Sequence, residues 1–154
     1  MRIALYQPEI AGNVGAVMRI GACLGVAVDL IEPLGFAWDD ARVRRAAMDY
    51  IDHVELARHA GFAAFRESVG AARLVLLTTK ASGSVYDFAF ANGDVLLFGQ
   101  ESAGVPEAVA EACAARVRIP MTAGLRSMNL ASSAALVAGE ALRQVGGLPG
   151  SARA

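Results

Sequence analysis

Short runs rich in Val, Ile and Leu alternate along this chain with longer segments of helical period, and this alternation limits the possible folds more than any other feature. Polar residues, Gly or Pro close each apolar run; the runs cover residues 3–6, 26–31, 74–78, 95–98 and 116–119. Strands that alternate with helices pair in parallel. We therefore expect an α/β fold, a single domain with a mostly parallel sheet flanked by helices.

The segments between these runs predict the helices. The first is expected to begin near residues 12–13, where apolar side chains begin to recur on one face. The last covers about residues 129–145 and places Glu140 where it can pair with Arg143. Shorter helices are expected at residues 39–49 and 62–69 and, with a first-turn proline, from Pro106.

Length and charge set further bounds. The chain has 154 residues, and we expect one domain at residues 1–146 followed by a flexible tail at 147–154. The net charge of −1 is unusual for a non-specific nucleic-acid binder, so any RNA contact must be local. The start of the chain is typical of a first strand rather than a signal peptide, which favours the cytoplasm.

The sequence has few residues that could bind a metal or form disulfides. Its cysteines are Cys23 and Cys113, its histidines are His53 and His59, and their spacing is not that of metal ligands. We expect both histidines at the surface. A Ser-His-Asp triad is disfavoured, because neither histidine lies in the polar segments that follow the strands.

Three polar segments follow predicted strands, and parallel sheets bind ligands beyond the carboxyl ends of their strands. Residues 7–15 lead into the helix that carries Arg19, an arrangement that suits a phosphate or a ribose. The alternative is that Asn13 caps this helix and Arg19 is solvated. The first segment therefore predicts either an anion site or an ordinary helix start.

The other two segments offer further candidates. Residues 99–106 form a Gly-x-Glu-x-x-Gly turn in which Glu101 is a ligand, a catalytic carboxylate, or a residue favourable to the helix dipole. The dinucleotide fingerprint Gly-x-Gly-x-x-Gly does not occur, which disfavours a nicotinamide dehydrogenase. In residues 120–133, Ser127 or Asn129 is expected to cap the last helix, and either could contact a substrate.

Taken together, the three segments resemble the motifs of the SPOUT class of RNA methyltransferases, in its group that methylates ribose 2′-oxygens. The resembling motifs are Asn13-x-Gly15-x-x-x-Arg19, Phe98-Gly99-x-Glu101-x-x-Gly104-x-Pro106, and Ile119-Pro120-Met121 with Ser127-Met128-Asn129-Leu130. Residues 31–50 are similar to the small enzymes that methylate the wobble nucleotide 34 of tRNA, cytidine or uridine. The resemblance extends from residue 3 to about residue 146.

This resemblance implies a C-terminal deep trefoil knot and S-adenosylmethionine as cofactor, with no metal. It implies a homodimer that binds the tRNA anticodon stem-loop, with no membrane partner, and methylates the ribose 2′-hydroxyl of the wobble nucleotide. The implied cofactor-binding residues are Leu77, Thr78, Gly99, Glu101, Gly104, Ile119, Met121, Ser127, Met128 and Leu130. The implied catalytic or substrate-positioning residues are Asn13, Arg19, Glu101, Ser127 and Asn129.

The chain departs from the wobble enzymes at two positions. Ala103 stands where they often carry arginine, and Gly139 where they often carry tyrosine. One alternative is a ribose methyltransferase for another tRNA or rRNA position. A non-catalytic RNA- or nucleotide-binding module is disfavoured because the implied catalytic residues are all present. A flavodoxin-like enzyme is disfavoured because Pro8 and Glu9 stand where an anion cradle needs N–H donors.

Overall fold

The computed structural model describes residues 1–150, with the backbone alone described for residues 42, 44, 46–49 and 51. In this part of the chain, the strands form one seven-stranded sheet in the order β3-β2-β1-β6-β4-β7-β5, and every pairing is parallel. The strands are β1 (Arg2–Tyr6), β2 (Ala27–Ile31), β3 (Leu56–His59), β4 (Leu74–Leu77), β5 (Gly83–Ser84), β6 (Val95–Phe98) and β7 (Ala115–Arg118). The predicted parallel sheet is confirmed.

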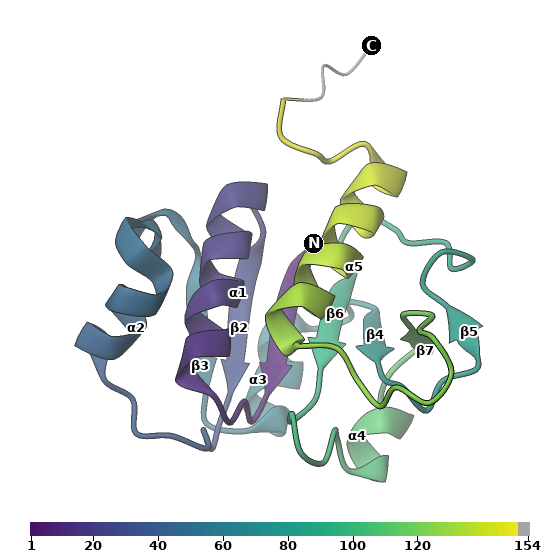
Figure 1. Cartoon of the computed structure of the whole chain (residues 1–154), viewed down its shortest axis with the longest axis horizontal. Helices are drawn as coiled ribbons and strands as arrows, with labels where there is room; N and C mark the ends of the chain where they lie inside the picture. Colours follow the sequence, from purple (N-terminus) through teal and green to yellow (C-terminus); the bar gives the residue numbers. More distant parts are fainter. Residues whose placement is uncertain (151–154) are drawn as a thin grey trace.

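Helices cover both faces of the sheet (Figure 1). They are α1 (Ala11–Leu24), α2 (Asp40–Ala47), the 3-10 helix η1 (Met48–His53), α3 (Phe62–Val69), α4 (Glu107–Glu111) and α5 (Leu130–Val145). Residues of α1, α2 and α5 share one apolar cluster, whereas residues of α3 and α4 belong to a second. The α/β fold with a sheet flanked by helices is thus as expected.

The two clusters account for the uninterrupted apolar strands of the sequence. In β1, Ile3 and Leu5 belong to the cluster with α1 and α5, while Ala4 and Tyr6 belong to the cluster with α3 and α4. Alternate side chains of a strand point to opposite faces, so a strand with helices on both sides is apolar at every position.

Helix α1 begins slightly earlier than the sequence predicts. Its N-cap is Ile10, whose side chain makes no capping bond, and Asn13 lies inside the first turn. The alternative in which Asn13 caps the helix is therefore wrong. The expected apolar face is buried, and a Cβ on Gly21 would lie 2.6 Å from the Val26 carbonyl oxygen. Glycine at this position allows α1 to lie against the start of β2.

Helix α5 agrees closely with its prediction. Asn129 is the N-cap, and its side-chain oxygen accepts hydrogen bonds from the backbone N–H groups of Ala131 and Ser132. The Arg143 Nε donates to a Glu140 carboxylate oxygen at 2.8 Å, as the spacing predicts. Gly146 ends the helix with a φ of 65°. Of the predicted tail, residues 151–154 lie outside the described residues.

Several sequence predictions need correction. β3 and β5 were not expected, because β3 carries Arg58 and His59 among few apolar residues and β5 has two residues. The helix expected at residues 39–49 is α2 followed by η1. The expected surface position of His59 is wrong: its side chain is 10% exposed, and its Nε2 lies 2.8 Å from Oδ1 of the buried Asp29.

Among the described residues, no helix is long and apolar enough to cross a membrane, and no group of His, Cys, Asp or Glu side chains is arranged to hold a metal ion.

Candidate functional site

The three polar segments meet at one edge of the sheet. β1 lies next to β6, β6 next to β4 and β4 next to β7, all parallel, so the loops that follow them leave the sheet at the same end. In Figure 1 this is the lower edge, toward which the strand arrows point. Side chains that are far apart in the sequence can therefore interact here.

A chain of side-chain hydrogen bonds joins the three loops. The Asn129 Nδ2 donates to the Asn13 Oδ1 at 2.9 Å, and the Asn13 Nδ2 donates to the Glu101 Oε1 at 3.1 Å. The Asn129 Oδ1 is already fixed by the start of α5. The amides of Asn129 and Asn13 are therefore both held in one orientation. We call Asn129, Asn13 and Glu101 the site relay.

Two acidic residues clamp the first loop to the second. The Glu9 backbone N–H donates to the Glu101 Oε2 at 2.9 Å. In return, the Glu9 carboxylate accepts hydrogen bonds from the Ser102 hydroxyl at 2.6 Å and the Ser102 backbone N–H at 2.8 Å. These bonds hold the pKa of Glu9 below its ordinary value, the hydroxyl bond contributing most. Glu9 therefore stays ionised and keeps the two loops together.

The glycine turn after β6 folds tightly on itself. Gln100 and Gly104 form an antiparallel bridge through two backbone hydrogen bonds of 2.9 and 3.0 Å. A Cβ on Gly99 would lie 2.5 Å from the Gly104 carbonyl carbon, and Gly104 has a φ of 71°. Both positions thus require glycine, one for close approach and one for its backbone conformation. The turn holds Glu101 toward the first loop.

Arg19 lies further along α1 than the relay. Its side chain is exposed, and its guanidinium carbon lies 5.1 Å from the centre of the Tyr50 ring. Such a contact restricts the guanidinium without removing its charge. Tyr50 lies in η1, within the segment that is similar to the wobble enzymes, but it was not among the implied site residues.

The residues implied for the cofactor surround the same edge. Leu77, Thr78, Gly99, Glu101, Gly104, Ile119 and Met121 are half-buried, Leu130 is buried, and Ser127 and Met128 are exposed. Met128 is 40% exposed, and Leu125, in the same loop, is 67% exposed. Apolar side chains and glycine backbone at a strand edge fit an adenine base, which would cover this apolar surface.

Sequence reasoning missed Glu9, Ser102 and Tyr50. Glu9 stands in the first candidate segment, and an acidic residue three positions after the last residue of a strand was the available signal. Its partner could not be identified, because the adjacency of β1 and β6 appears only in the folded sheet.

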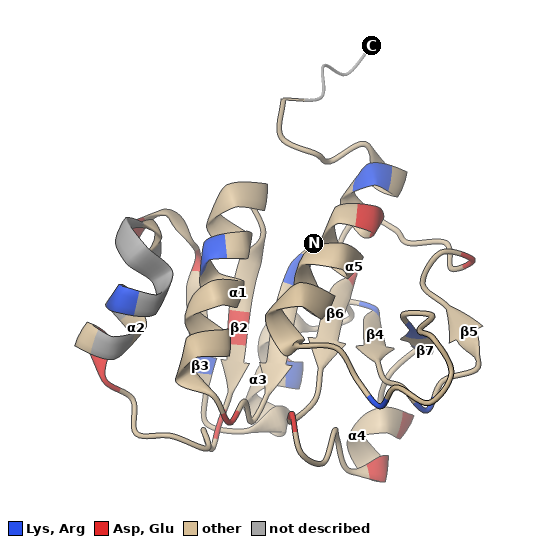
Figure 2. Cartoon of the chain, in the orientation of Figure 1, with Lys and Arg blue, Asp and Glu red and all other residues tan. Residues whose placement is uncertain are grey.

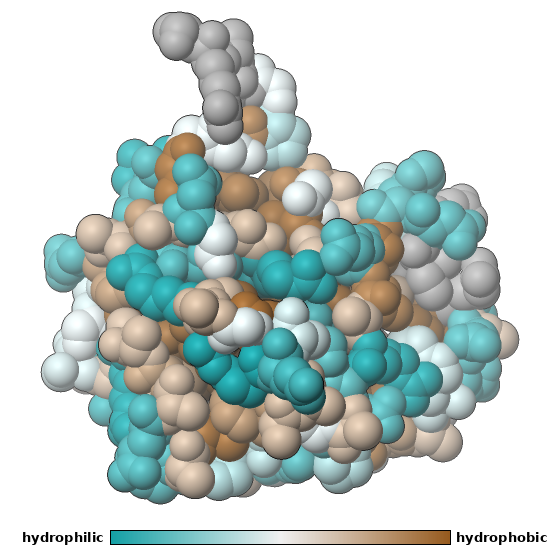
Figure 3. Space-filling view, turned by 180° about the vertical axis from the view of Figure 1, so that it is seen from behind, coloured by the Kyte–Doolittle hydropathy of each residue, from teal (hydrophilic) through white to brown (hydrophobic). Residues whose placement is uncertain are grey.

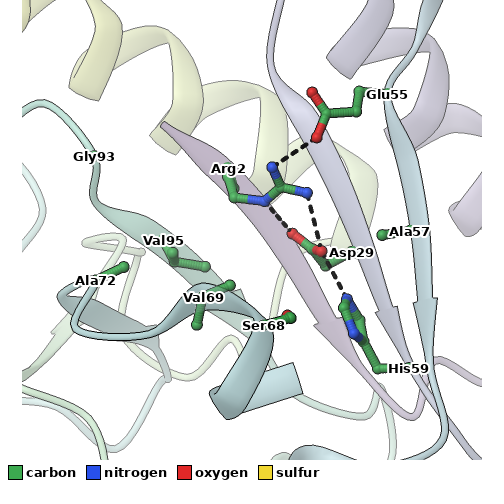
Figure 4. Close-up of a pocket in the computed structure, with 10 residues that line it drawn as sticks. All are labelled: Arg2, Asp29, Glu55, Ala57, His59, Ser68, Val69, Ala72, Gly93 and Val95. Atoms are coloured by element: carbon green, nitrogen blue, oxygen red, sulfur yellow. Dashed lines mark hydrogen bonds and ion pairs between the residues drawn. The ribbon is translucent and has the colours of Figure 1, made fainter. Parts of the chain in front are cut away.

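A separate cavity of about 450 Å³ lies against the face of the sheet that α3 covers (Figure 4). Arg2 donates to the Asp29 carboxylate at 2.7 and 3.1 Å and to Glu55 at 2.8 Å, and His59 also contacts Asp29. The Asp29 contact holds the pKa of Arg2 above its usual range. Seen from behind, this side mixes hydrophilic and hydrophobic residues (Figure 3). Arg2, the one arginine among the residues that line the cavity, is thus paired with two carboxylates.

Known proteins are similar to this chain over most of its length. The model of the SpoU rRNA Methylase family matches residues 1–139. A tRNA (cytidine(34)-2'-O)-methyltransferase from Beijerinckia indica subsp. indica is 55% identical over 148 residues, which cover 95% of this chain and 92% of that protein.

Solved structures agree with the sequence comparison. One, described as "Structural insights into the 2-OH methylation of C/U34 on tRNA", has a TM-score of 0.88 and 43% identity, covering 93% of this chain and 94% of the other. The SpoU methyltransferase AviRb from Streptomyces viridochromogenes, in complex with AdoMet, has a TM-score of 0.82 and 25% identity, covering 94% of this chain and 60% of the other.

Proposed function

The chain belongs to the SpoU rRNA Methylase family, and we propose that it transfers a methyl group from S-adenosylmethionine to the ribose 2′-hydroxyl of the wobble nucleotide 34 of tRNA. The observation that carries this proposal is the site relay, in which Asn129, Asn13 and Glu101 join all three motifs at the carboxyl edge of the sheet. The similarity to tRNA (cytidine(34)-2'-O)-methyltransferases over nearly the whole chain supports this choice of substrate.

The cofactor supplies an electrophilic methyl group when it is bound. Leu77, Ile119 and Leu130 would enclose its base, and the backbone of the glycine turn would approach its polar groups. These side chains are apolar and lie at the ends of the neighbouring strands β4 and β7 and at the start of α5, which also limits the access of water to the reacting atoms.

The reaction requires that a ribose 2′-hydroxyl is aligned and loses its proton, and the relay residues serve alignment. Both Glu101 oxygens already accept hydrogen bonds, from the Glu9 N–H and the Asn13 amide. Glu101 therefore orients Asn13, which in turn orients Asn129. The second hydrogen of the Asn129 amide remains to donate to the substrate. Fixed positioning of this kind supplies a large part of a rate enhancement.

Arg19 would stabilise negative charge rather than act as a general base. A guanidinium is fully protonated at neutral pH, so it cannot accept the hydroxyl proton. Arg19 is exposed on the helix that carries Asn13, where it would hold the phosphate next to the target ribose and stabilise negative charge on the 2′-oxygen. Ser127, exposed in the third loop, would contact the substrate or orient that loop.

The proposed enzyme is a knotted homodimer that acts on the anticodon stem-loop in the cytoplasm. The path of the chain supports the knot: after β7 it returns past β4 and β6 to α5, which packs against α1. Apolar side chains support the dimer: Ile10 before α1 is 51% exposed and Leu136 on α5 is 43% exposed. A second copy would cover such side chains.

Methylation mapping tests this function. The protein is incubated with an unmodified tRNA anticodon stem-loop and methyl-labelled S-adenosylmethionine, and the position of the label is read from resistance of the ribose to alkaline cleavage. We expect label on the ribose of nucleotide 34 and none on a matched RNA with 2′-deoxyribose at that position. Label at another ribose would indicate a different target, which the departures at Ala103 and Gly139 make the first alternative. Label on a base would contradict ribose methylation, and absence of label would favour a non-catalytic binding module.

A further inference from the structure

The basic residues of the described part differ in whether a carboxylate neutralises them. Five arginines form ion pairs with Asp or Glu: Arg2, Arg58, Arg73, Arg116 and Arg143. Four other described basic residues are exposed and form no ion pair with another described residue: Arg45 on α2, and Lys80, Arg118 and Arg126. Unpaired surface cations cost little in water and leave their charge available to a partner.

Lys80, Arg118 and Arg126 lie on neighbouring segments at one corner of the sheet, whereas Arg45 lies on α2. Lys80 follows β4, whose end is fixed to β7 by the hydrogen bond from the Thr78 N–H to the Val117 carbonyl. Arg118 is the next residue of β7 and pairs in register with Ser84 of β5. Arg126 lies in the loop that leaves β7 and ends at Asn129. The corner therefore adjoins both the implied cofactor residues and the relay.

The same corner lacks negative charge. Residues 68–86 and 112–139 contain no Asp or Glu but five basic residues, although the whole chain has a net charge of −1. Figure 2 shows basic but not acidic positions on the loops below β4 and β7, and the acidic positions next to them lie on α4. On α4, Glu107 forms an ion pair with Arg116 and with none of Lys80, Arg118 and Arg126. The local field is thus positive, opposite in sign to the chain as a whole.

We propose that Lys80, Arg118 and Arg126 form a phosphate-binding corner that holds the RNA backbone beside the candidate active site. The proposal rests on the proposed function, since it names the surface on which that substrate lies. Such a corner fits phosphate groups, because Lys binds a phosphate as a point charge and Arg binds it through two parallel hydrogen bonds. The residues next to these cations along the chain are Ser, Thr or apolar residues and carry no charge, so they neither compete for the cations nor repel an anion.

Salt dependence of binding tests this corner. The triple variant Lys80→Gln, Arg118→Gln, Arg126→Gln and the unaltered protein are titrated with a fluorescent tRNA anticodon stem-loop between about 50 and 200 mM KCl. Loss of three phosphate contacts should make the slope of log K against log salt less steep by about 2 to 3. Between these two salt concentrations, the loss of RNA affinity should therefore be about 30-fold smaller in the triple variant than in the unaltered protein. The KM for RNA should rise, while kcat at saturating RNA and the affinity for S-adenosylmethionine stay unchanged.

Arg143→Gln is the matched control. It removes one positive charge, against three in the triple variant, from an exposed side chain at the far end of α5, where Glu140 already neutralises it, and its slope should equal that of the unaltered protein. An unchanged slope and KM in the triple variant would overturn the corner, as would a loss of slope in Arg143→Gln that is about one third of the loss in the triple variant, because equal losses per charge would indicate an effect of net charge alone. Failure of the proposed function is seen separately, as absence of methyl transfer by the unaltered protein.

Discussion

Replacing Gly99 by alanine tests how tightly the glycine turn is packed. The added Cβ would lie 2.5 Å from the carbonyl carbon and 2.7 Å from the Cα of Gly104, closer by about 1 Å than an ordinary carbon contact. Because both atoms are backbone, no side chain can move aside, and the two hydrogen bonds between Gln100 and Gly104 must open. At about 1 kcal/mol for each bond and 1 to 3 kcal/mol for overpacking, Gly99→Ala should lower the free energy of unfolding by about 3 to 5 kcal/mol.

Urea unfolding measures this loss, and calorimetry on the folded variant measures its affinity for S-adenosylmethionine, which should fall at least about tenfold as the turn is displaced. Gly139→Ala is the matched control. Gly139 lies within α5, and a Cβ there meets no atom within 4 Å, so this variant should be more stable by about 0.5 to 1 kcal/mol. Equal unfolding midpoints for Gly99→Ala and the unaltered protein would show that the turn accommodates a Cβ at this position without strain.

Three further predictions concern the loops of the site. Asn129→Asp keeps the oxygen that caps α5 but loses the amide that donates to Asn13, so urea unfolding should show unchanged stability while the methylation assay shows lost turnover; Asn129→Ala should also lose about 1 kcal/mol of stability. Arg19→Lys should lower kcat about tenfold or more, and full turnover with unchanged tRNA affinity would exclude a need for the guanidinium fork. The lowered pKa of Glu9 stabilises the fold above the ordinary pKa of 4.5, and this contribution is lost as the pH falls through the lowered value; Ser102→Ala should therefore reduce the loss of stability on acidification, measured by urea unfolding from about pH 6 to pH 3.

The strands and helices that could be predicted from the sequence are those with a continuous run or face of apolar residues. β1, β2 and β6 lie inside the sheet, with helices on both faces, so all of their residues except Arg2 and Asp29 are apolar and they are easy to recognise. Helices α1 and α5 each present one continuous buried face. By contrast, β3 and β5 lie at the two edges of the sheet and carry polar residues or consist of only two, so no apolar run marks them.

Prediction of the site had a similar limit. That three segments would lie beyond the ends of parallel strands followed from the order of elements along the chain. The order of strands across the sheet did not, and it is this order that places Glu9 beside Ser102 and Asn13 beside Glu101. His59 shows the same limit, because its partner Asp29 lies on a neighbouring strand that the sequence could not identify as adjacent.

In the proposed enzyme, the loops after β4, β6 and β7 hold the methyl donor at the edge where the relay lies. A crystal structure of the protein with S-adenosylmethionine bound would locate the donor. We expect electron density for the adenine among Leu77, Ile119 and Leu130, with the methyl carbon facing the side of Asn13 and Arg19. Density for the donor in the cavity beside Arg2, Asp29 and His59, with those three loops empty, would contradict it.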